Sequence, residues 1–131
     1  MSEDLYAFLH PIKPEEITEE IVVSERFKDK DGNVIPFKIR ALTKGKVEQL
    51  ARKCRAKHAG KDFDIDVELG NAMIVEATVR PDFKNAELCD AYGTLDPIEV
   101  VSKMLLFGEA NKLADAIAKL SGADKGIDVK N

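Results

Sequence analysis

Start and stop signals divide residues 82–122, the last third of the chain, into three short helices. Asn85 can begin the first helix, because its side-chain oxygen can accept a hydrogen bond from an amide that a helix N-terminus leaves unpaired. Gly93 can end it, because glycine adopts the left-handed conformation at little cost. Short helices cannot bury their apolar faces by themselves, so this region must pack against other elements or against a partner. The face of the first helix carries Leu88, Ala91 and Tyr92.

The second helix has the clearest start of the three. Asp96 is a capping residue, and Pro97 follows at the first helical position, where its missing N–H costs no hydrogen bond. Glu99, three residues after Asp96, completes the pattern of a capping box. We expect this helix to end at Gly108.

The third helix, over residues 109–122, carries one apolar stripe with helical spacing. A stripe of this kind usually packs inside its own domain, and we favour that interpretation. The alternative is that its larger side chains contact a partner protein. The candidates for such contacts are Leu113, Ile117 and Leu120.

The length of 131 residues suits a single domain with one modest core. Hydrophobic residues make up 44% of the chain and charged residues 34%, a globular balance with a well-solvated surface. No apolar run reaches the length of a membrane span, and the acidic N-terminus lacks the features of a signal peptide. We therefore expect a cytoplasmic protein in which Cys54 and Cys89 are free thiols.

Upstream of the helices, residues 21–42 have the pattern of a β-hairpin. Apolar and polar residues alternate over 21–27 and again over 34–42, and Asp-Gly at 31–32 is a turn signal between them. Pro36 has no amide hydrogen, so we expect its strand to be an edge there or to direct that position to solvent. Because a two-stranded hairpin is marginal by itself, its apolar face should pack on helices.

Two more helices are predicted over residues 43–58 and 64–79, from their capping residues and apolar spacing. The sequence therefore predicts an α+β fold, a mainly helical single domain with one N-terminal antiparallel β-hairpin packed on four or five helices. The globular domain spans residues 21–122. It follows an N-terminal segment at 1–20 and precedes a mobile tail at 123–131.

The N-terminal segment contains an apolar cluster that ends before Pro11. Termini with several large apolar residues are usually tied down, so we favour docking of this cluster against the core of its own domain. The alternative is a short linear motif that binds another protein through Phe8 and Leu9. The whole cluster consists of Leu5, Tyr6, Phe8 and Leu9.

Charge is unevenly distributed along the chain. Residues 38–61 contain nine Lys or Arg and one Glu, a net charge of +8, so the rest of a chain whose total is −4 carries −12. Charge runs on helices are usually solvated faces, which is the interpretation we favour. The alternative is a patch that steers a partner, or a second copy of the chain, through Arg52, Arg55 and Lys57.

Two arrangements resemble metal sites without matching one. Cys54 and His58 are four residues apart on a predicted helix, with Cys89 or His10 as a further ligand, but no Cys-x-x-Cys motif accompanies them. The acidic residues within 62–68 alternate as in a calcium loop, but apolar residues fill the gaps and the glycine of such a loop is missing. We favour a core thiol with a boundary imidazole in the first case and an acidic first helical turn in the second.

The sequence contains no recognisable catalytic motif. The run at 43–46 lacks the spacing of a phosphate-binding loop, and two histidines leave few candidates for a general base. We therefore predict a protein that is not an enzyme and needs no cofactor. The alternative to an interaction protein is a small nucleic-acid-associated or regulatory domain that uses the basic helix 43–58, although the acidic remainder would repel nucleic acid.

Five short blocks, in their order and spacing, are similar to the XkdN-like phage tail assembly chaperone family of PBSX-type prophages. They extend over nearly the whole chain. Family members more usually have a proline where this chain has Phe107 and an aromatic residue where it has Ala110. The blocks are residues 8–11 (FLHP), 36–40 (PFKIR), 81–88 (PDFKNAEL), 92–93 (YG) and 104–113 (MLLFGEANKL).

This resemblance implies a small cytoplasmic protein, without catalytic activity, that acts during assembly of a long-tailed phage. It implies a chaperone that binds the tape measure protein, keeps it soluble, helps to recruit tail tube subunits and is absent from the finished virion. The expected partners are the tape measure protein, the tail tube protein and further copies of the chain. No membrane or nucleic-acid partner is expected.

Overall fold

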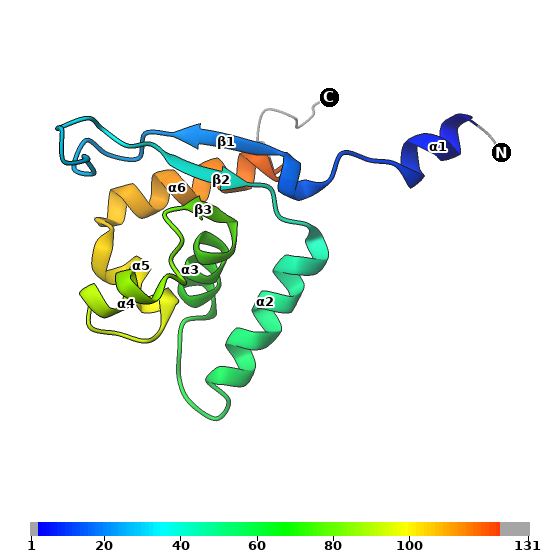
Figure 1. The fold of residues 1–131 in the computed structure, drawn as a ribbon. Coiled ribbons are helices and arrows are strands. Elements are labelled where there is room, and N and C mark those ends of the chain that lie inside the picture. Colours follow the sequence, from blue (N-terminus) through cyan, green and yellow to red (C-terminus); the bar gives the residue numbers. More distant parts are fainter. Residues whose placement is uncertain (1–2, 124–131) are drawn as a thin grey trace.

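The computed structural model describes residues 3–123, in which helices pack against a three-stranded antiparallel sheet (Figure 1). The fold class is α+β, as the sequence predicts. The predicted C-terminal tail lies, from residue 124 onward, outside the described residues. In chain order the elements are α1 (Glu3–Leu9), the 3-10 helix η1 (Pro14–Glu16), β1 (Thr18–Ile21), β2 (Phe37–Arg40), α2 (Lys44–Lys57), α3 (Ile65–Ala77), β3 (Thr78–Arg80), α4 (Ala86–Ala91), α5 (Pro97–Met104) and α6 (Phe107–Leu120).

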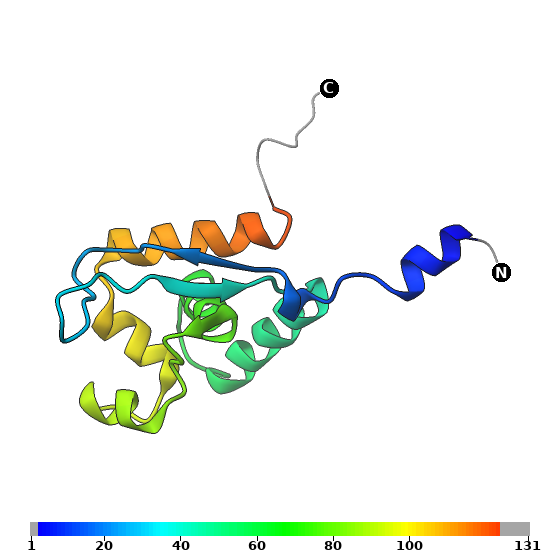
Figure 2. The same ribbon diagram turned by 45° about the horizontal axis from the view of Figure 1, so that its top comes forward.

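Strand β2 is the centre of the sheet, with β1 on one side and β3 on the other. Ile21 of β1 lies opposite Phe37 of β2. Because successive side chains of a strand point to opposite faces, Phe37 and Ile39 share one face, and both are buried. Helix α6 runs along β1 and β2 (Figure 2), and α3 contacts β3. The central strand therefore contributes two buried side chains to the core, and Ile21 of β1 packs against them from the edge.

The strands differ in position from the predicted hairpin. β1 begins before the first predicted strand, and β2 covers only part of the second. Between them runs a long connection, residues 22–36, with an isolated bridge between Lys28 and Val34 near its tip. Alternation did not reveal this arrangement, because Val23 in the connection is buried in the core like a strand residue.

The third strand replaces the end of the helix predicted over residues 64–79. Helix α3 stops at Ala77, and the next three residues pair with β2. Residues 78–80 form a strand because they pair with β2, which is distant in the sequence, and the local residue pattern does not indicate this pairing. β2 is thus a central strand rather than an edge, and Pro36 lies just outside its ladder, where its carbonyl accepts hydrogen bonds from the Arg80 guanidinium at 2.9 and 3.1 Å.

Side-chain capping bonds confirm four predicted helix starts. At α2, α3, α4 and α5, an oxygen of the capping side chain accepts a hydrogen bond from a first-turn amide at 3.0 to 3.2 Å. Of the acidic residues within 62–68, Asp64 thus forms the cap of α3, and Asp66 and Glu68 lie in its first turn. The capping residues are Thr43, Asp64, Asn85 and Asp96.

The capping box expected at α5 does not form. The carboxylate of Glu99 accepts a hydrogen bond from the Thr94 hydroxyl instead of from the Asp96 amide. That amide donates to the Thr94 hydroxyl oxygen at 3.0 Å. Thr94 therefore stands between the two groups that the box would have joined directly.

The prediction that Gly108 ends α5 is wrong. Helix α5 ends at Met104, and Gly108 is the second residue of α6. The boundary lies earlier because the Glu109 carboxylate accepts a hydrogen bond from the Leu106 amide at 2.8 Å, which satisfies the start of α6. Gly93 does follow α4 with a φ of +69°, the left-handed conformation expected of it.

The core lies between the sheet and helices α3, α5 and α6. A second, smaller cluster of Leu50, Cys54 and Ala72 joins α2 to α3. Within residues 3–123, no helix is both long enough and apolar enough to cross a membrane. The largest fully buried side chains of the main core are Phe83, Ile39, Ile74, Leu113, Ile117, Val100 and Val101.

Candidate interaction surfaces

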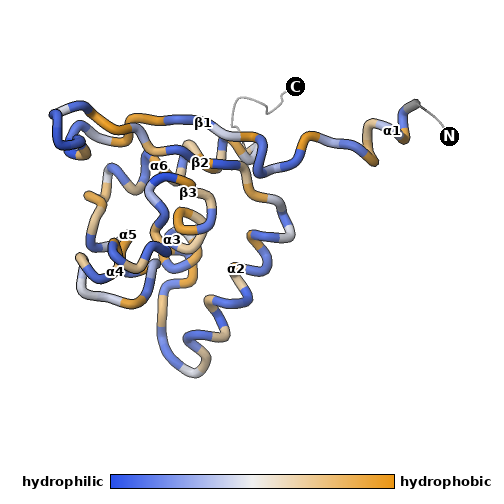
Figure 3. The backbone as a smooth tube through the Cα atoms, in the orientation of Figure 1, coloured by the Kyte–Doolittle hydropathy of each residue, from blue (hydrophilic) through white to orange (hydrophobic). Residues whose placement is uncertain are grey.

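The N-terminal arm, residues 3–13, extends away from the sheet and the other helices (Figure 1). The prediction that its apolar cluster docks against the core of the domain is therefore wrong. Phe8 is 79% exposed and Leu9 is 56% exposed. Leu5 and Ile12 are exposed as well, so the arm presents several hydrophobic residues along its length (Figure 3). This exposure fits the alternative, a short linear motif for another protein.

Helix α2 carries the basic patch, and part of its charge is neutralised within the molecule. Lys57 Nζ lies 2.7 Å from a carboxylate oxygen of Asp96 and 3.1 Å from one of Glu68. The hydrogen bond to Asp96 is the main cause that raises the pKa of Lys57. Lys57 thus joins α2 to α3 and to the start of α5. Arg52 and Arg55 are exposed, and in the part of the chain that the structure describes they form no ion pair.

Glu76 on α3 gathers three further cations. Its carboxylate lies 2.8 Å from Arg40 Nη2, 3.8 Å from Lys46 Nζ and 3.5 Å from Lys84 Nζ. The net charge of residues 38–61 therefore overstates the charge that α2 presents to a partner. Among the described residues, the exposed cations of α2 that pair with no carboxylate are Arg52, Lys53 and Arg55.

The apolar stripe of α6 lies mostly inside the core. Leu113 is 0% exposed and Ile117 is 1% exposed, while Leu120 is half-buried. This agrees with the favoured interpretation that the stripe packs within the domain. Of the three candidate contacts, Leu120 is the one that offers surface to a partner without unfolding.

Cys54 and His58, considered from the sequence as metal ligands, make contacts of another kind. Cys54 is buried, which raises the pKa of its thiol. The His58 ring stacks on Phe63 with centroids 4.5 Å apart, and its Nε2 lies 3.3 Å from a carboxylate oxygen of Glu68. Cys89, like Cys54, is buried and free. Across residues 3–123, no group of three or more His, Cys, Asp or Glu side chains could hold a metal ion.

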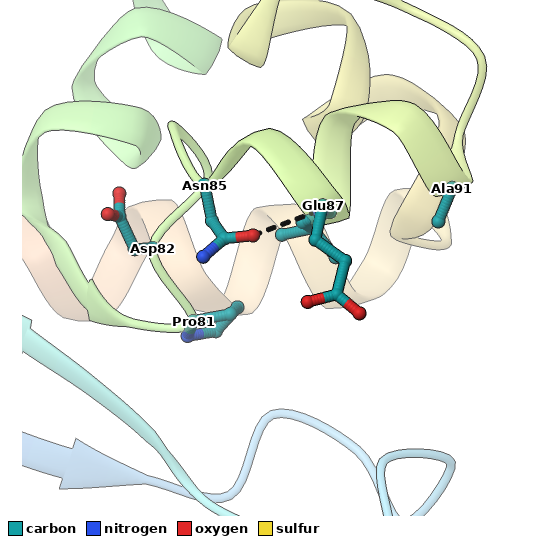
Figure 4. Close-up of a pocket in the computed structure, with 6 residues that line it drawn as sticks. Pro81, Asp82, Asn85, Glu87 and Ala91 are labelled. Carbon is teal, nitrogen blue, oxygen red and sulfur yellow. Dashed lines mark hydrogen bonds between the residues drawn. The ribbon is translucent and has the colours of Figure 1, made fainter.

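An apolar groove that the sequence did not predict lies between α4 and the connection 22–36. Its inner part is a cavity of about 280 Å³, and its outer part has a volume of about 430 Å³ (Figure 4). The two parts share Pro81 and Leu88, so they form one continuous surface. Residues of the inner part include Phe27, Ile35, Pro36, Leu88, Tyr92 and Met104. The outer part is lined by Pro81, Asp82, Asn85, Glu87, Leu88 and Ala91.

The walls of the groove come from segments that are distant in the sequence. In the inner part, the connection 22–36 forms one wall and residues 88–92 form the other, with residues 80–81 between them. The outer part is lined by residues 81–91 alone. The predicted face of Leu88, Ala91 and Tyr92 was a partial signal, since all three line the groove. The opposite wall, from the connection 22–36, could not be predicted, because nothing in the sequence places this connection beside α4.

An ion pair fixes the connection 22–36 to α6 beside the groove. Arg26 Nη2 lies 2.7 Å from Glu109 Oε1, and Arg26 Nε donates to Glu109 Oε2 at 2.8 Å. Nη2 also donates to the carbonyl of Met104 at 2.9 Å. The hydrogen bond from Arg26 is the main cause that lowers the pKa of Glu109 to about 2. The pair therefore helps to hold one wall of the groove in position.

Comparisons with known proteins name one family. The family described as phage XkdN-like tail assembly chaperone protein matches residues 5–130. The chain is 38% identical to the phage-like element PBSX protein XkdN of Bacillus subtilis (strain 168) over 113 residues, which cover 81% of this chain and 75% of that protein. It is also 38% identical to the uncharacterized protein YqbN of the same strain over 124 residues, 89% of this chain and 81% of that protein. The crystal structure of the protein YqbN matches with a TM-score of 0.73 at 33% identity, covering 90% of this chain and 96% of that one.

Proposed function

This chain belongs to the phage XkdN-like tail assembly chaperone family, and on that premise we propose that it binds the tape measure protein while a phage tail is assembled. The tail tube protein is the second proposed partner and joins the same complex. The chain acts as a chaperone in the cytoplasm of the bacterial host, without catalysis. It leaves the complex before the tail is finished.

The exposed N-terminal arm is the observation that carries this proposal. Its apolar side chains lie in water in the isolated chain, and a contiguous exposed apolar surface marks a place where another protein binds. A chaperone that coats a long partner needs such weak, repeatable contacts rather than a catalytic pocket. Arg52 and Arg55 on α2 add charge that can steer the encounter.

Co-purification tests the proposal. A tagged form of the chain is expressed together with the tape measure and tail tube proteins of the same phage. We expect the tape measure protein to elute with the tagged chain at physiological salt, and finished tails to contain none of the chain. A tape measure protein that never elutes with the chain would contradict the proposal.

Chromatography of the chain by itself tests the alternative function, nucleic-acid binding by the basic helix 43–58. The purified chain is applied to immobilised heparin and to DNA at moderate salt. We expect it to flow through, because ion pairs within the molecule neutralise part of the charge on α2. Retention on DNA without binding of the tape measure protein would favour the nucleic-acid-associated function instead.

A further inference from the structure

The N-terminal arm presents one apolar helix face that its own domain leaves in water. Leu5, Phe8 and Leu9 stand at positions i, i+3 and i+4 of α1, so they share one face of the helix. All three side chains are exposed. An apolar face with this spacing is the form in which a short helix binds to an apolar groove on a protein.

The groove between α4 and the connection 22–36 can receive such a face. Its inner part, of about 280 Å³, has an apolar lining that includes Phe27, Ile35 and Leu88. It continues into the outer part, of about 430 Å³, through Pro81 and Leu88, which line both. Binding of α1 there removes two apolar surfaces from water at once, which is favourable.

The charges of the arm and the groove are complementary. Lys13 follows the apolar residues of the arm, is exposed, and forms no ion pair with any residue that the structure describes. Glu87 lines the outer part of the groove (Figure 4), is exposed as well, and within residues 3–123 has no ion-pair partner. Lys84, a cation close to it in the sequence, lies 3.5 Å from Glu76 instead. Lys13 and Glu87 are therefore both available for a contact between molecules.

The order of charges matches at the other end as well. Asp4 precedes the apolar residues of the arm, and Lys28 follows Phe27, which lines the inner part of the groove and not the outer part. Lys28 is exposed and forms no ion pair in the part of the chain that the structure describes. An arm that places Lys13 at Glu87 thus brings its acidic end toward a cation.

The arm points away from the groove of its own domain. It precedes β1 and the connection 22–36 follows β1, and Figures 1 and 2 show the two at opposite ends of the strand. Backbone hydrogen bonds hold the base of the arm in this direction. The Ile17 amide donates to the Pro14 carbonyl at 3.0 Å, and the Ala41 amide donates to the Ile17 carbonyl at 2.9 Å.

We propose that the arm of one copy of the chain binds in the groove of another copy, with Phe8 and Leu9 in the inner part and Lys13 at Glu87. Because arm and groove lie at opposite ends of β1, each copy can donate its arm to one neighbour and receive the arm of another, so copies join head to tail. The inference concerns the chain by itself and does not rest on the function proposed above. The tape measure protein competes with the groove for the arm.

Two variants each remove one half of this contact. Phe8→Ser/Leu9→Ser removes apolar side chains of the arm and leaves the groove intact. Ala91→Trp fills the outer part of the groove and leaves the arm intact. Ala86→Trp is the control, because Ala86 and Ala91 are both exposed and are the first and last residues of α4, but only Ala91 lines the groove.

Light scattering of the purified chain measures association from about 1 μM to about 1 mM. We expect the average mass of the wild type and of Ala86→Trp to rise with concentration, and Phe8→Ser/Leu9→Ser and Ala91→Trp to stay at the mass of the monomer. An equimolar mixture of these last two variants should reach about twice the monomer mass and no more, because one intact arm meets one intact groove. A wild type that stays monomeric, or a mixture that does not combine, overturns the inference.

Charge reversal tests how the arm lies in the groove. Lys13→Glu and Glu87→Lys should each weaken association about fivefold or more, because each places like charges together. Lys13→Glu/Glu87→Lys in one chain should restore association to within about twofold of the wild type. A double variant that associates as weakly as the single variants overturns the pairing, and the inference with it.

Co-purification separates this inference from the proposed function. Ala91→Trp keeps a free arm, so it should still elute with the tape measure protein, as the wild type should. A wild type that associates with itself but never elutes with the tape measure protein supports the inference and contradicts the proposed function alone. Thermal unfolding of each variant verifies that it is folded.

Discussion

The carboxylate of Glu109 accepts hydrogen bonds from two parts of the chain. One bond comes from the Leu106 amide at the start of α6, and the others come from Arg26, 83 residues away in the sequence. Glu109 is 8% exposed, so its charge depends on these bonds in place of water. A single side chain thus sets the first residue of α6 and the position of the connection 22–36.

This arrangement predicts a pH dependence of stability. The pKa of Glu109 is lowered from 4.5 to about 2 in the folded chain, so the unfolded chain binds the proton more readily. The contribution of Glu109 to the free energy of unfolding is therefore complete above about pH 4.5 and is lost as the pH falls towards about 2. Urea unfolding of the wild type and of Glu109→Gln over this range measures it.

Glu109→Gln keeps the shape of the side chain and removes its charge. We expect the difference in unfolding free energy between the wild type and this variant to be largest near neutral pH and to shrink on acidification. A difference that stays constant from neutral pH down to the lowest measured pH would contradict the role assigned to the ion pair.

At the scale of elements, the helix starts are encoded locally. Asp64 begins α3 by accepting hydrogen bonds from the amides of Asp66 and Val67, at 3.0 and 3.2 Å. Such a cap satisfies donors that the helix itself leaves unpaired. The contribution of the Asp64 cap to the free energy of unfolding should therefore be measurable separately from that of the rest of the fold.

Asp64→Ala should lower the free energy of unfolding by about 1 kcal/mol, the usual effect of losing a capping side chain. Asp62→Ala is the matched control, because Asp62 is exposed, lies two residues earlier, and caps no helix. Equilibrium denaturation in urea measures both variants. Equal effects of the two substitutions would show that general acidity near α3, rather than the cap, stabilises the helix.

The same distinction between local and distant interactions explains what the sequence could predict of the fold. Caps and apolar spacing lie within a few residues, so α2 to α5 were located at their starts. The strands at 18–21 and 78–80 exist because each pairs with β2, a partner that is distant in the sequence. The early start of α6 depends on Glu109, whose partner Arg26 lies in a different segment. The pattern of residue types along the chain does not show which distant segments pair.

At the scale of the whole molecule, the candidate contacts lie in different environments. The arm is exposed, α2 presents Arg52 and Arg55, and Leu113 and Ile117 of α6 are buried while Leu120 is half-buried. The spacing of the α6 stripe correctly favoured burial, but the apolar residues of the arm gave the same expectation and are exposed, because burial follows from packing. The sequence did not reveal the groove, since the groove exists only where α4 meets the connection 22–36.

The remaining charge on α2 predicts an effect on association rate. The double variant Arg52→Glu/Arg55→Glu should bind the tape measure protein about threefold to tenfold more slowly, with a weaker dependence on salt. Arg52→Lys/Arg55→Lys keeps the charge and is the control. Lys57 is left unchanged, because it bonds Asp96 and Glu68 within the chain. Stopped-flow binding gives the rates, and identical rates for both variants would rule out steering by α2.

The arm is the surface on which the chaperone proposal most depends. Phe8→Ser/Leu9→Ser removes two exposed apolar side chains, so it should leave the free energy of unfolding unchanged within about 0.5 kcal/mol. Val67→Ser is the control, because Val67 is also exposed, at 59%, but lies on α3. Only Phe8→Ser/Leu9→Ser should lose the ability to keep the tape measure protein soluble.

The most direct measurement is the amount of tape measure protein in the soluble fraction of cells that express it with and without this chain. We predict that the wild type and Val67→Ser keep it soluble, and that Phe8→Ser/Leu9→Ser leaves most of it insoluble. A tape measure protein that remains insoluble beside the wild-type chain would contradict the account.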